Sequence, residues 1–586
     1  MYTGMIIDSF FIIICGCSAG LIVTFFMLKF VMLKKHWIFI INLLIFALLL
    51  AKNPFSERSL IPNFEPYPDT IHYVNSARSF IEGHGLQIYR EGRALKTNVP
   101  PLYSLVLMPL FLIYNDPRMF YFTNVILALL SFFLFYKILR KTLIASDQRL
   151  MLAPRSLGEV GTNYLIIFIT LFLYATNYFF YWYPTLAMAE NLALTLFMGA
   201  IYLLLIPLSK KNAVYASLIS VAFYATKYAS IPLTGFFFLS YLAKIYLDQR
   251  YATGVKKNIK LYFILIFSSV FLFFIYSLWE WYAKGSTLLV SSIKSTSSVS
   301  SGGWFSLAYV NKYLPHYLRA LAGGERIRFL WDDTPIVPIY VGISALIGFI
   351  FGVIQKQTRF ITISLLLMLF SSILFMSSFY SQDMRYLYHA IPTLLLGFAL
   401  FWKTVLSFTL PLSFPRRRES SLIFIFLLIA LFLFYLFTNA IRLKKQIMLN
   451  LKYVETPWYY ISVLELNKYF ATPPNPDKKP IVISSMSPYY IDFFSNRNYS
   501  LLPLSLSQDF WNTPKEAWGN FDYSNLITLY HKALLNNYPI YVHNYGLGNE
   551  QVLRDDFKKI QDTFKLELVQ TGCFNACNIW RLRERD

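Results

Sequence analysis

Long apolar runs without charged side chains recur along most of this 586-residue chain, and they restrict its fold more than any other feature. A helix needs about 20 consecutive apolar residues to cross the hydrocarbon core of a bilayer. Charged residues make up 14% of the chain, against about 25% in soluble domains. The chain is therefore predicted to be an α-helical polytopic membrane protein, because most of its side chains have no water to face.

About twelve apolar runs are predicted to cross the membrane. They lie near residues 6–30, 37–51, 118–138, 163–182, 186–206, 214–227, 230–246, 261–281, 336–354, 359–378, 386–402 and 421–439. The transmembrane domain is accordingly assigned to residues 1–440. The remaining residues, 441–586, are expected to form a separate soluble domain.

Basic residues in the short loops predict the orientation of these spans. Lysine and arginine favour cytoplasmic loops, and one alternation of spans places nearly all the basic loops on one side: Lys34 and Lys35, 140–155, Lys210 and Lys211, 250–260, Lys356 and Arg359, and 416–418. The segments 52–117, 283–335 and 440–586 then share the outer side. The net charge of +22 is explained by loops facing anionic lipid, without nucleic acid as a partner.

The segment after about residue 456 has the pattern of a small α/β domain. Residues 480–486, 538–545, 564–571 and 578–583 are predicted as strands, and 522–536 and 550–563 as helices. The chain has no Walker loop, dinucleotide fingerprint, HExxH or GxSxG motif. We therefore expect no nucleotide cofactor and no ATP-driven pump.

The first outer loop holds a predicted amphipathic helix within residues 66–85, with Asp69 in its first turn. Its spacing predicts a helix in the membrane interface, with one apolar face formed by Ile71, Val74, Ala77, Phe80 and Ile81. Asp69 could cap this helix and complement its dipole, or it could carry chemistry. The apolar run 104–114 that follows is too short to span a bilayer and is expected to dip into the interface.

These landmarks carry a resemblance to a known family. Asp69 is followed by His72 and Tyr73, then by a GHG helix end and by PPLY at 100–103. This order resembles the GT-C lipid-linked glycosyltransferases, which include the aminoarabinose transferases, the protein O-mannosyltransferases and their bacterial relatives. The resemblance covers roughly residues 37–402. Many members carry Asp-Glu where this chain has Asp69-Thr70, so a single acid remains here to act as base.

Glu190 and Lys227 match two further landmarks. Glu190 is expected about two turns inside the membrane, in the span that follows the turn at 181–184, and an acid in that setting is a functional candidate. The resemblance implies that it lies near the donor phosphate, with a divalent metal ion as a possible intermediary; the alternative is a carboxylate satisfied by hydroxyls or helix ends. Residues 214–246 are expected to form a helical hairpin broken at 225–227. The Lys227 ammonium would bind a phosphate there. The alternative is a lysine at a helix end whose side chain snorkels, so that its charged group reaches water.

Arg385 belongs to the third landmark, in the element Asp383-Met384-Arg385-Tyr386 that resembles the family motif RYLLP. An arginine can bind a phosphate through two parallel hydrogen bonds. The alternative is a salt bridge between Arg385 and Asp383. Under the predicted topology all these candidates meet at the outer side.

The resemblance implies an inverting membrane glycosyltransferase with a polyprenyl-phosphate sugar donor and a lipid, glycan or protein acceptor. Asp69 would be the base, and Lys227 and Arg385 would bind the phosphate. The expected location is the bacterial inner membrane, with the C-terminal domain on the outer side. A transporter or lipid flippase is the alternative from another class, although no repeated halves are evident in the sequence. A non-catalytic scaffold that binds through the C-terminal domain is a third.

Overall fold

The computed structural model describes most of the chain in separate ranges. The ranges are 37–52, 54, 68–90, 93–96, 99–144, 157–251, 255–284, 306–322, 327–329, 332–334, 336–379, 387–409, 415–451, 458–472, 479–485, 491, 495–496, 498–505, 525–545, 551–572 and 577–585. The chain divides into two compact units. Unit 1 comprises Met1–Ala51, Asn124–Pro184 and Ala189–Lys452, and unit 2 comprises Lys52–Thr123, Thr185–Met188 and Tyr453–Asp586.

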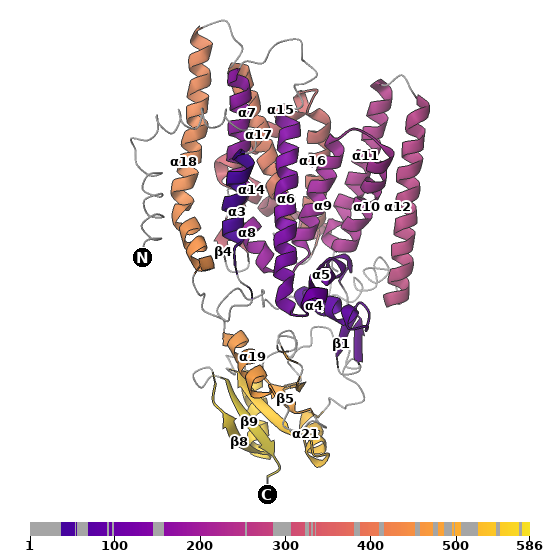
Figure 1. Cartoon of the computed structure of the whole chain (residues 1–586), viewed down its shortest axis with the longest axis vertical. Coiled ribbons are helices and arrows are strands. Elements are labelled where there is room, and N and C mark those ends of the chain that lie inside the picture. The colour runs from indigo at the N-terminus through magenta and orange to yellow at the C-terminus, as the bar shows by residue number, and fades with distance from the viewer. Residues whose placement is uncertain are drawn as a thin grey trace. The chain divides into compact units, whose positions relative to one another are not determined.

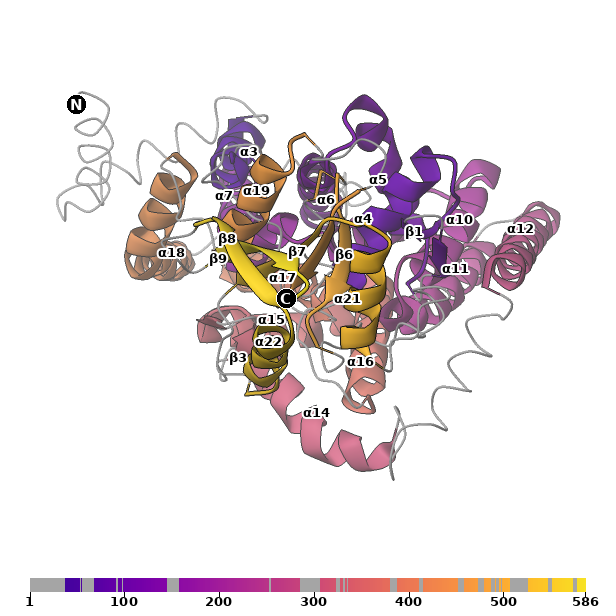
Figure 2. The same ribbon diagram turned by 90° about the horizontal axis from the view of Figure 1, so that it is seen from below.

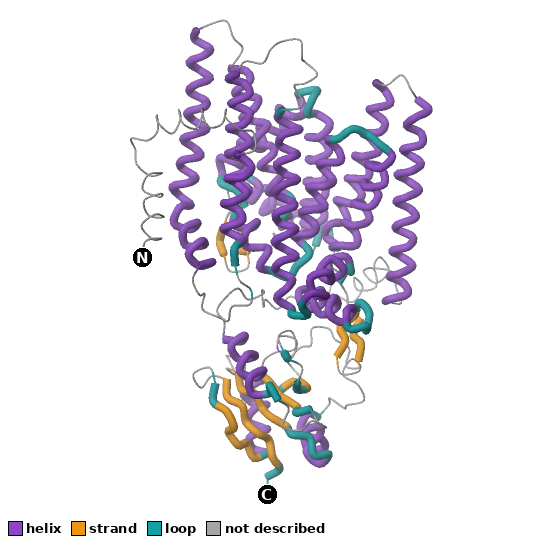
Figure 3. Tube along the Cα trace, viewed as in Figure 1, coloured by secondary structure: helices purple, strands orange, loops and turns teal. Residues whose placement is uncertain are grey.

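Unit 1 is a bundle of helices, drawn in purple in Figure 3. Figure 1 labels its main helices, among which α10, α11 and α12 run side by side. The helices are α3 (Trp37–Leu50), α6 (Phe120–Leu143), α7 (Leu157–Ala175), α8 (Tyr178–Trp182), α9 (Glu190–Leu205), α10 (Lys210–Thr226), α11 (Ile231–Tyr251), α12 (Val255–Lys284), α14 (Leu307–Leu321), α15 (Ile339–Ile354), α16 (Arg359–Ser377), α17 (Ala390–Thr409) and α18 (Pro415–Leu451), with a small hairpin of β3 (Ile327–Phe329) and β4 (Asp332–Thr334).

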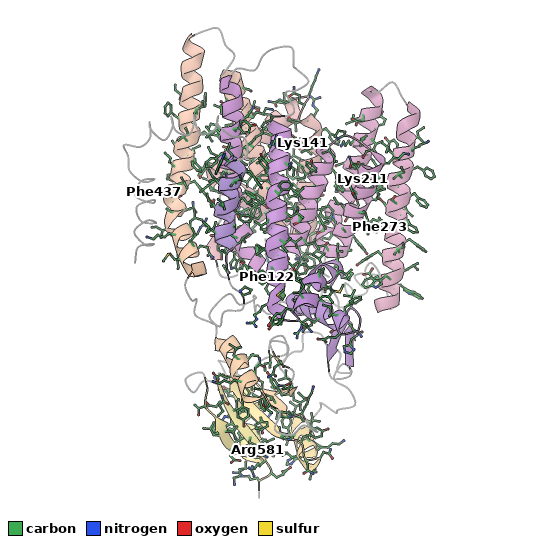
Figure 4. All side chains as sticks on the ribbon, in the orientation of Figure 1. Phe122, Lys141, Lys211, Phe273, Phe437 and Arg581 are labelled. Atoms are coloured by element: carbon green, nitrogen blue, oxygen red, sulfur yellow. The ribbon has the colours of Figure 1, made fainter. Side chains whose placement is uncertain are left out.

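The long apolar helices make this a multi-pass membrane protein. In the described ranges, five helices are long and apolar enough to cross a membrane, or six if the bent pair Gly161–Ala175 and Tyr178–Thr185 is one span. Shorter apolar helices, among them α3, α9 and α15, match further predicted runs. Twelve spans remain a prediction, and the first predicted run lies outside the described residues. Phe437 on α18, labelled in Figure 4, is 73% exposed, as expected for a side chain facing lipid.

Small residues bring α15 and α17 into close contact. A Cβ atom added to Gly348 on α15 would lie 1.9 Å from the carbonyl oxygen of Gly397 on α17. Such an approach is possible only for glycine. Membrane helices commonly pack through small residues, because apolar burial alone gives no driving force between helices in lipid.

Basic side chains lie at one end of unit 1. Lys141, in the last turn of α6, and Lys211, in the first turn of α10, lie at the same end of the unit in Figure 4.

Helix α14 lies crosswise to the bundle helices, which Figure 2 shows end-on. The start of α14 is held at the end of α16 by a hydrogen bond from Ser306 N–H to the Ser378 carbonyl, 2.9 Å long.

Unit 2 contains a mixed five-stranded sheet in the order β6-β5-β7-β9-β8. The strands β5 (Ile481–Ser484), β6 (Ser500–Pro503) and β7 (Ile540–Tyr545) are parallel. Strand β9 (Cys577–Arg583) pairs antiparallel with both β7 and β8 (Lys565–Gln570). Helices α19 (Trp458–Tyr469), α21 (Leu526–Leu535) and α22 (Gln551–Thr563) complete this domain. The four strands and two helices predicted from the sequence are confirmed. The short strand β6 and helix α19 were not predicted.

The first outer loop also belongs to unit 2 and forms α4 (Pro68–Ile81), strands β1 (Gln87–Arg90) and β2 (Arg93–Lys96), and α5 (Leu102–Ile113). The predicted helix in 66–85 and the short apolar helix are confirmed. However, every residue from Tyr73 to Ser79 is buried. Asn75 and Ser76 are thus as buried as Val74 and Ala77, so burial does not follow the predicted apolar face. The location of α4 in the membrane interface stays a prediction.

Candidate functional site

Lys227 stands at the break between α10 and α11, as the sequence predicts. It is the C-cap of α10 and has an extended backbone, with φ −161° and ψ 141°. Its N–H donates to the Phe223 carbonyl at 3.3 Å, and its own carbonyl accepts from Ser230 N–H at 3.0 Å. The backbone therefore turns sharply at Lys227, and the break holds its side chain at the tip of the hairpin.

Glu190 is the first residue of α9, so the helix begins four residues after the predicted start of the span at 186. Its predicted depth in the membrane stays a prediction. The N-cap residue Ala189 offers no side-chain cap to the helix. An acidic side chain in the first turn interacts favourably with the positive end of the helix dipole. At the other end of α9, the buried Lys244 donates to the Leu203 carbonyl at 2.9 Å and to the Ile206 carbonyl. A negative side chain at the start of α9 and a positive one at its end thus both complement the helix dipole.

Glu190 and Lys227 form a buried ion pair. The Lys227 Nζ atom donates to Glu190 Oε1, and the two side chains are 12% and 3% exposed. Their contact follows from topology, because α9 and α10 are consecutive packed helices and one begins where the other ends. Lys211 lies about 25 Å away along α10, at 1.5 Å rise per residue. The pair therefore occupies the end of unit 1 opposite to the basic residues Lys210 and Lys211.

A small cavity adjoins this ion pair. Its volume is about 20 Å³, enough for about one water molecule. Its lining is formed by Glu190, Ala193, Leu194, Lys227, Ala229, Ser230, Leu233, Tyr388 and His389. The last two residues were not predicted, although they follow the predicted 383–386 element directly.

Tyr388 and His389 bring different polar groups to the cavity. The Tyr388 hydroxyl donates to Asn191 Oδ1 and to the Phe179 carbonyl, both at 3.4 Å. The His389 ring packs against Phe197 with 5.2 Å between centroids. Its Nε2 atom is buried, and among the described residues it has no hydrogen-bond partner. A buried imidazole nitrogen without a partner is costly, so this atom is suited to contact a bound molecule.

Asp69, His72 and Tyr73 lie on α4 in unit 2. Asp69 is in the first turn, and its side chain lies outside the described ones. Tyr73 is buried and packs edge-on against Tyr103 of α5, with ring centroids 5.0 Å apart, while His72 is half-buried. Tyr73 therefore fastens α4 to α5. The approach of Asp69 to Lys227, and its choice between capping and catalysis, stay predictions.

The third landmark, with Asp383 and Arg385, lies outside the described residues, so its predicted contacts stay predictions. For a metal ion, the described ranges contain no group of three or more His, Cys, Asp or Glu side chains. Glu190 already contacts an ammonium group, which a metal ion would have to displace. The predicted divalent ion therefore stays a prediction.

Comparisons with known proteins identify the fold. No family model matches the chain, and a search of the curated proteins finds no match either. Among solved structures, the chain is similar to ArnT from Cupriavidus metallidurans in the apo state, with a TM-score of 0.52 and 12% identity over 93% of this chain and 97% of that one. It is also similar to the same protein bound to undecaprenyl phosphate, with a TM-score of 0.53 and 11% identity over the same shares. The chain therefore has the fold of ArnT, which is the GT-C fold.

Proposed function

We propose that this protein is a membrane glycosyltransferase that transfers a sugar from a polyprenyl-phosphate donor to a lipid, glycan or protein acceptor. The proposed location is the outer face of the bacterial inner membrane, with the sheet domain on the same side. The observation that carries the proposal is the buried Glu190–Lys227 pair beside a cavity, at the bundle end opposite to Lys210 and Lys211.

The fold supports the nature of the donor. ArnT, whose fold this chain has, was solved with undecaprenyl phosphate bound. Undecaprenyl phosphate is the leaving group that a polyprenyl-phosphate sugar would release. A lysine at a helix break suits such a phosphate, and so does a buried imidazole nitrogen that has no partner among the described residues, because both groups can donate hydrogen bonds to its oxygens.

The proposed reaction is a single displacement. The acceptor hydroxyl attacks the anomeric carbon, Asp69 accepts the hydroxyl proton, and the bond from the anomeric carbon to the phosphate oxygen breaks. The configuration of the sugar inverts, because no covalent enzyme intermediate forms. The leaving phosphate gains negative charge, which Lys227 and Arg385 stabilise. No step requires a nucleotide.

The test uses the purified protein with radiolabelled polyprenyl-phosphate sugars and a membrane extract as acceptor source. Transfer of label from the lipid to any acceptor is expected, and Lys227→Met should reduce it strongly. In liposomes, movement of the lipid-linked sugar between leaflets without transfer would contradict the proposal and identify a flippase instead.

A further inference from the structure

The Glu190 carboxylate occupies the positive environment that a bound phosphate would need. Its carboxylate contacts the Lys227 ammonium and belongs to the first turn of α9. The N-terminal end of a helix favours an anion, because its free N–H groups and its dipole are positive there. Two sources of positive potential therefore meet at one carboxylate, in a setting that is almost closed to solvent.

The cavity beside the pair is too small for a phosphate group in this state, since it has room for about one water molecule. It is also lined by His389, which is 6% exposed and whose Nε2 atom has no partner within the described part of the chain. This second feature, independent of the helix end, provides a hydrogen-bonding group that a ligand in the cavity would satisfy. A phosphate could contact both Lys227 and His389 only after the Glu190 carboxylate has moved away.

We infer that Glu190 is an internal stand-in for the donor phosphate. This inference rests on the proposed function and defines how its site is regulated. Without donor, the Glu190 carboxylate contacts the buried Lys227 ammonium and offsets its positive charge. The arriving phosphate replaces the carboxylate on Lys227 and gains the hydrogen bond from His389. After transfer, Glu190 returns to Lys227 and speeds the release of the polyprenyl phosphate.

The stand-in role makes a prediction opposite to that of a direct ligand. If Glu190 competes with the phosphate, only the fraction of protein with Lys227 released can bind, and the apparent affinity is lowered by that fraction. Glu190→Gln should therefore bind undecaprenyl phosphate about tenfold more tightly. With labelled donor it should lower both KM and kcat, because the product leaves slowly. If Glu190 had a purely structural role, its substitution would instead lower the stability of the protein and weaken binding.

The experiment measures the affinity of the full-length protein for undecaprenyl phosphate, together with its melting temperature without ligand. Glu190→Asp keeps the charge but reaches Lys227 less well, so its affinity should lie between wild type and Glu190→Gln. Glu190→Asp also tests the inference if Glu190→Gln does not fold. Glu280→Gln is the matched control, since it removes a buried carboxylate on α12 that does not line this cavity. Its affinity should stay near that of wild type.

The outcomes separate the two proposals. Unchanged or weaker binding in both Glu190 variants, with wild type binding normally, would overturn the stand-in role alone. A folded wild type that does not bind undecaprenyl phosphate, or binding that survives Lys227→Met, would overturn the proposed function and the stand-in role together.

Discussion

His543 is expected to make the sheet domain lose stability in mild acid. It lies on β7 and is 1% exposed. Its Nδ1 atom is 2.8 Å from Ser484 Oγ and its Nε2 atom is 2.6 Å from Ser462 Oγ. Burial lowers the pKa of the imidazole from 6.5 to about 3. The two serines satisfy both ring nitrogens, and no described carboxylate is hydrogen-bonded to the ring.

The direction of the effect follows from the two pKa values. In the unfolded chain the imidazole takes up a proton near pH 6.5, whereas in the folded domain it does so only near pH 3. Between these values the unfolded state binds more protons, so its free energy falls as the pH falls. The stability due to neutral His543 is therefore complete above pH 6.5 and decreases below it. At pH 5 the loss amounts to about 2 kcal/mol, at 1.36 kcal/mol for each pKa unit.

The assay is unfolding in urea, followed by pulse proteolysis of the full-length protein with a tag at its C-terminus. Stability is compared at pH 7.5 and pH 5 for wild type and for His543→Gln, whose amide does not titrate. The variant is expected to be less stable at pH 7.5, with a pH-dependent loss about 2 kcal/mol smaller than that of wild type. His531→Gln is the control, since His531 is at the surface beside Glu584, and it should keep the loss. An equal loss in wild type and His543→Gln would refute the reasoning.

Three other perturbations test the site, the packing and the topology. Asp69→Asn should reduce glycosyl transfer about 10²-fold or more, because it removes the proposed base while keeping a helix-capping oxygen; initial rates with labelled donor measure this. Gly348→Ala should destabilise the bundle by about 1–3 kcal/mol, because its Cβ would meet the α17 backbone; the melting temperature reports it. With the four native cysteines replaced by serine, Leu307→Cys should react with an impermeant maleimide in intact spheroplasts, whereas Lys211→Cys should react only after the membrane is opened.

Asp69→Asn and Gly348→Ala have matched control variants. Asp116→Asn keeps the cap of the short helix at Pro117–Met119 and loses only the ion pair with Arg118, so activity should stay near wild type. Wild-type activity in Asp69→Asn would remove this residue from the mechanism. Gly235→Ala meets no atom within 4 Å and should be tolerated. Equal labelling of both cysteines in sealed cells would contradict the predicted topology.

The sequence by itself determined the class of fold and the local features of the site. Apolar runs, β-strand patterns and the break at Lys227 depend on near neighbours along the chain, since helix and strand periodicity involves residues only a few positions apart. The hairpin break and the four predicted strands of the sheet domain could therefore be identified without a structure. Strand β6 and helix α19 could not, because their short patterns are indistinct.

Only the tertiary structure decided which polar groups meet. Glu190 and Lys227 are 37 positions apart, and Ser462 and His543 are 81 apart. The sequence alone did not show which partner any of these four side chains would contact. Antiparallel packing of α9 and α10 made the first pair, and the start of α9 at Glu190 moved the carboxylate to a helix end. The burial of His389, which turns an ordinary histidine into a candidate ligand, likewise depends on contacts between distant segments, which no local pattern encodes.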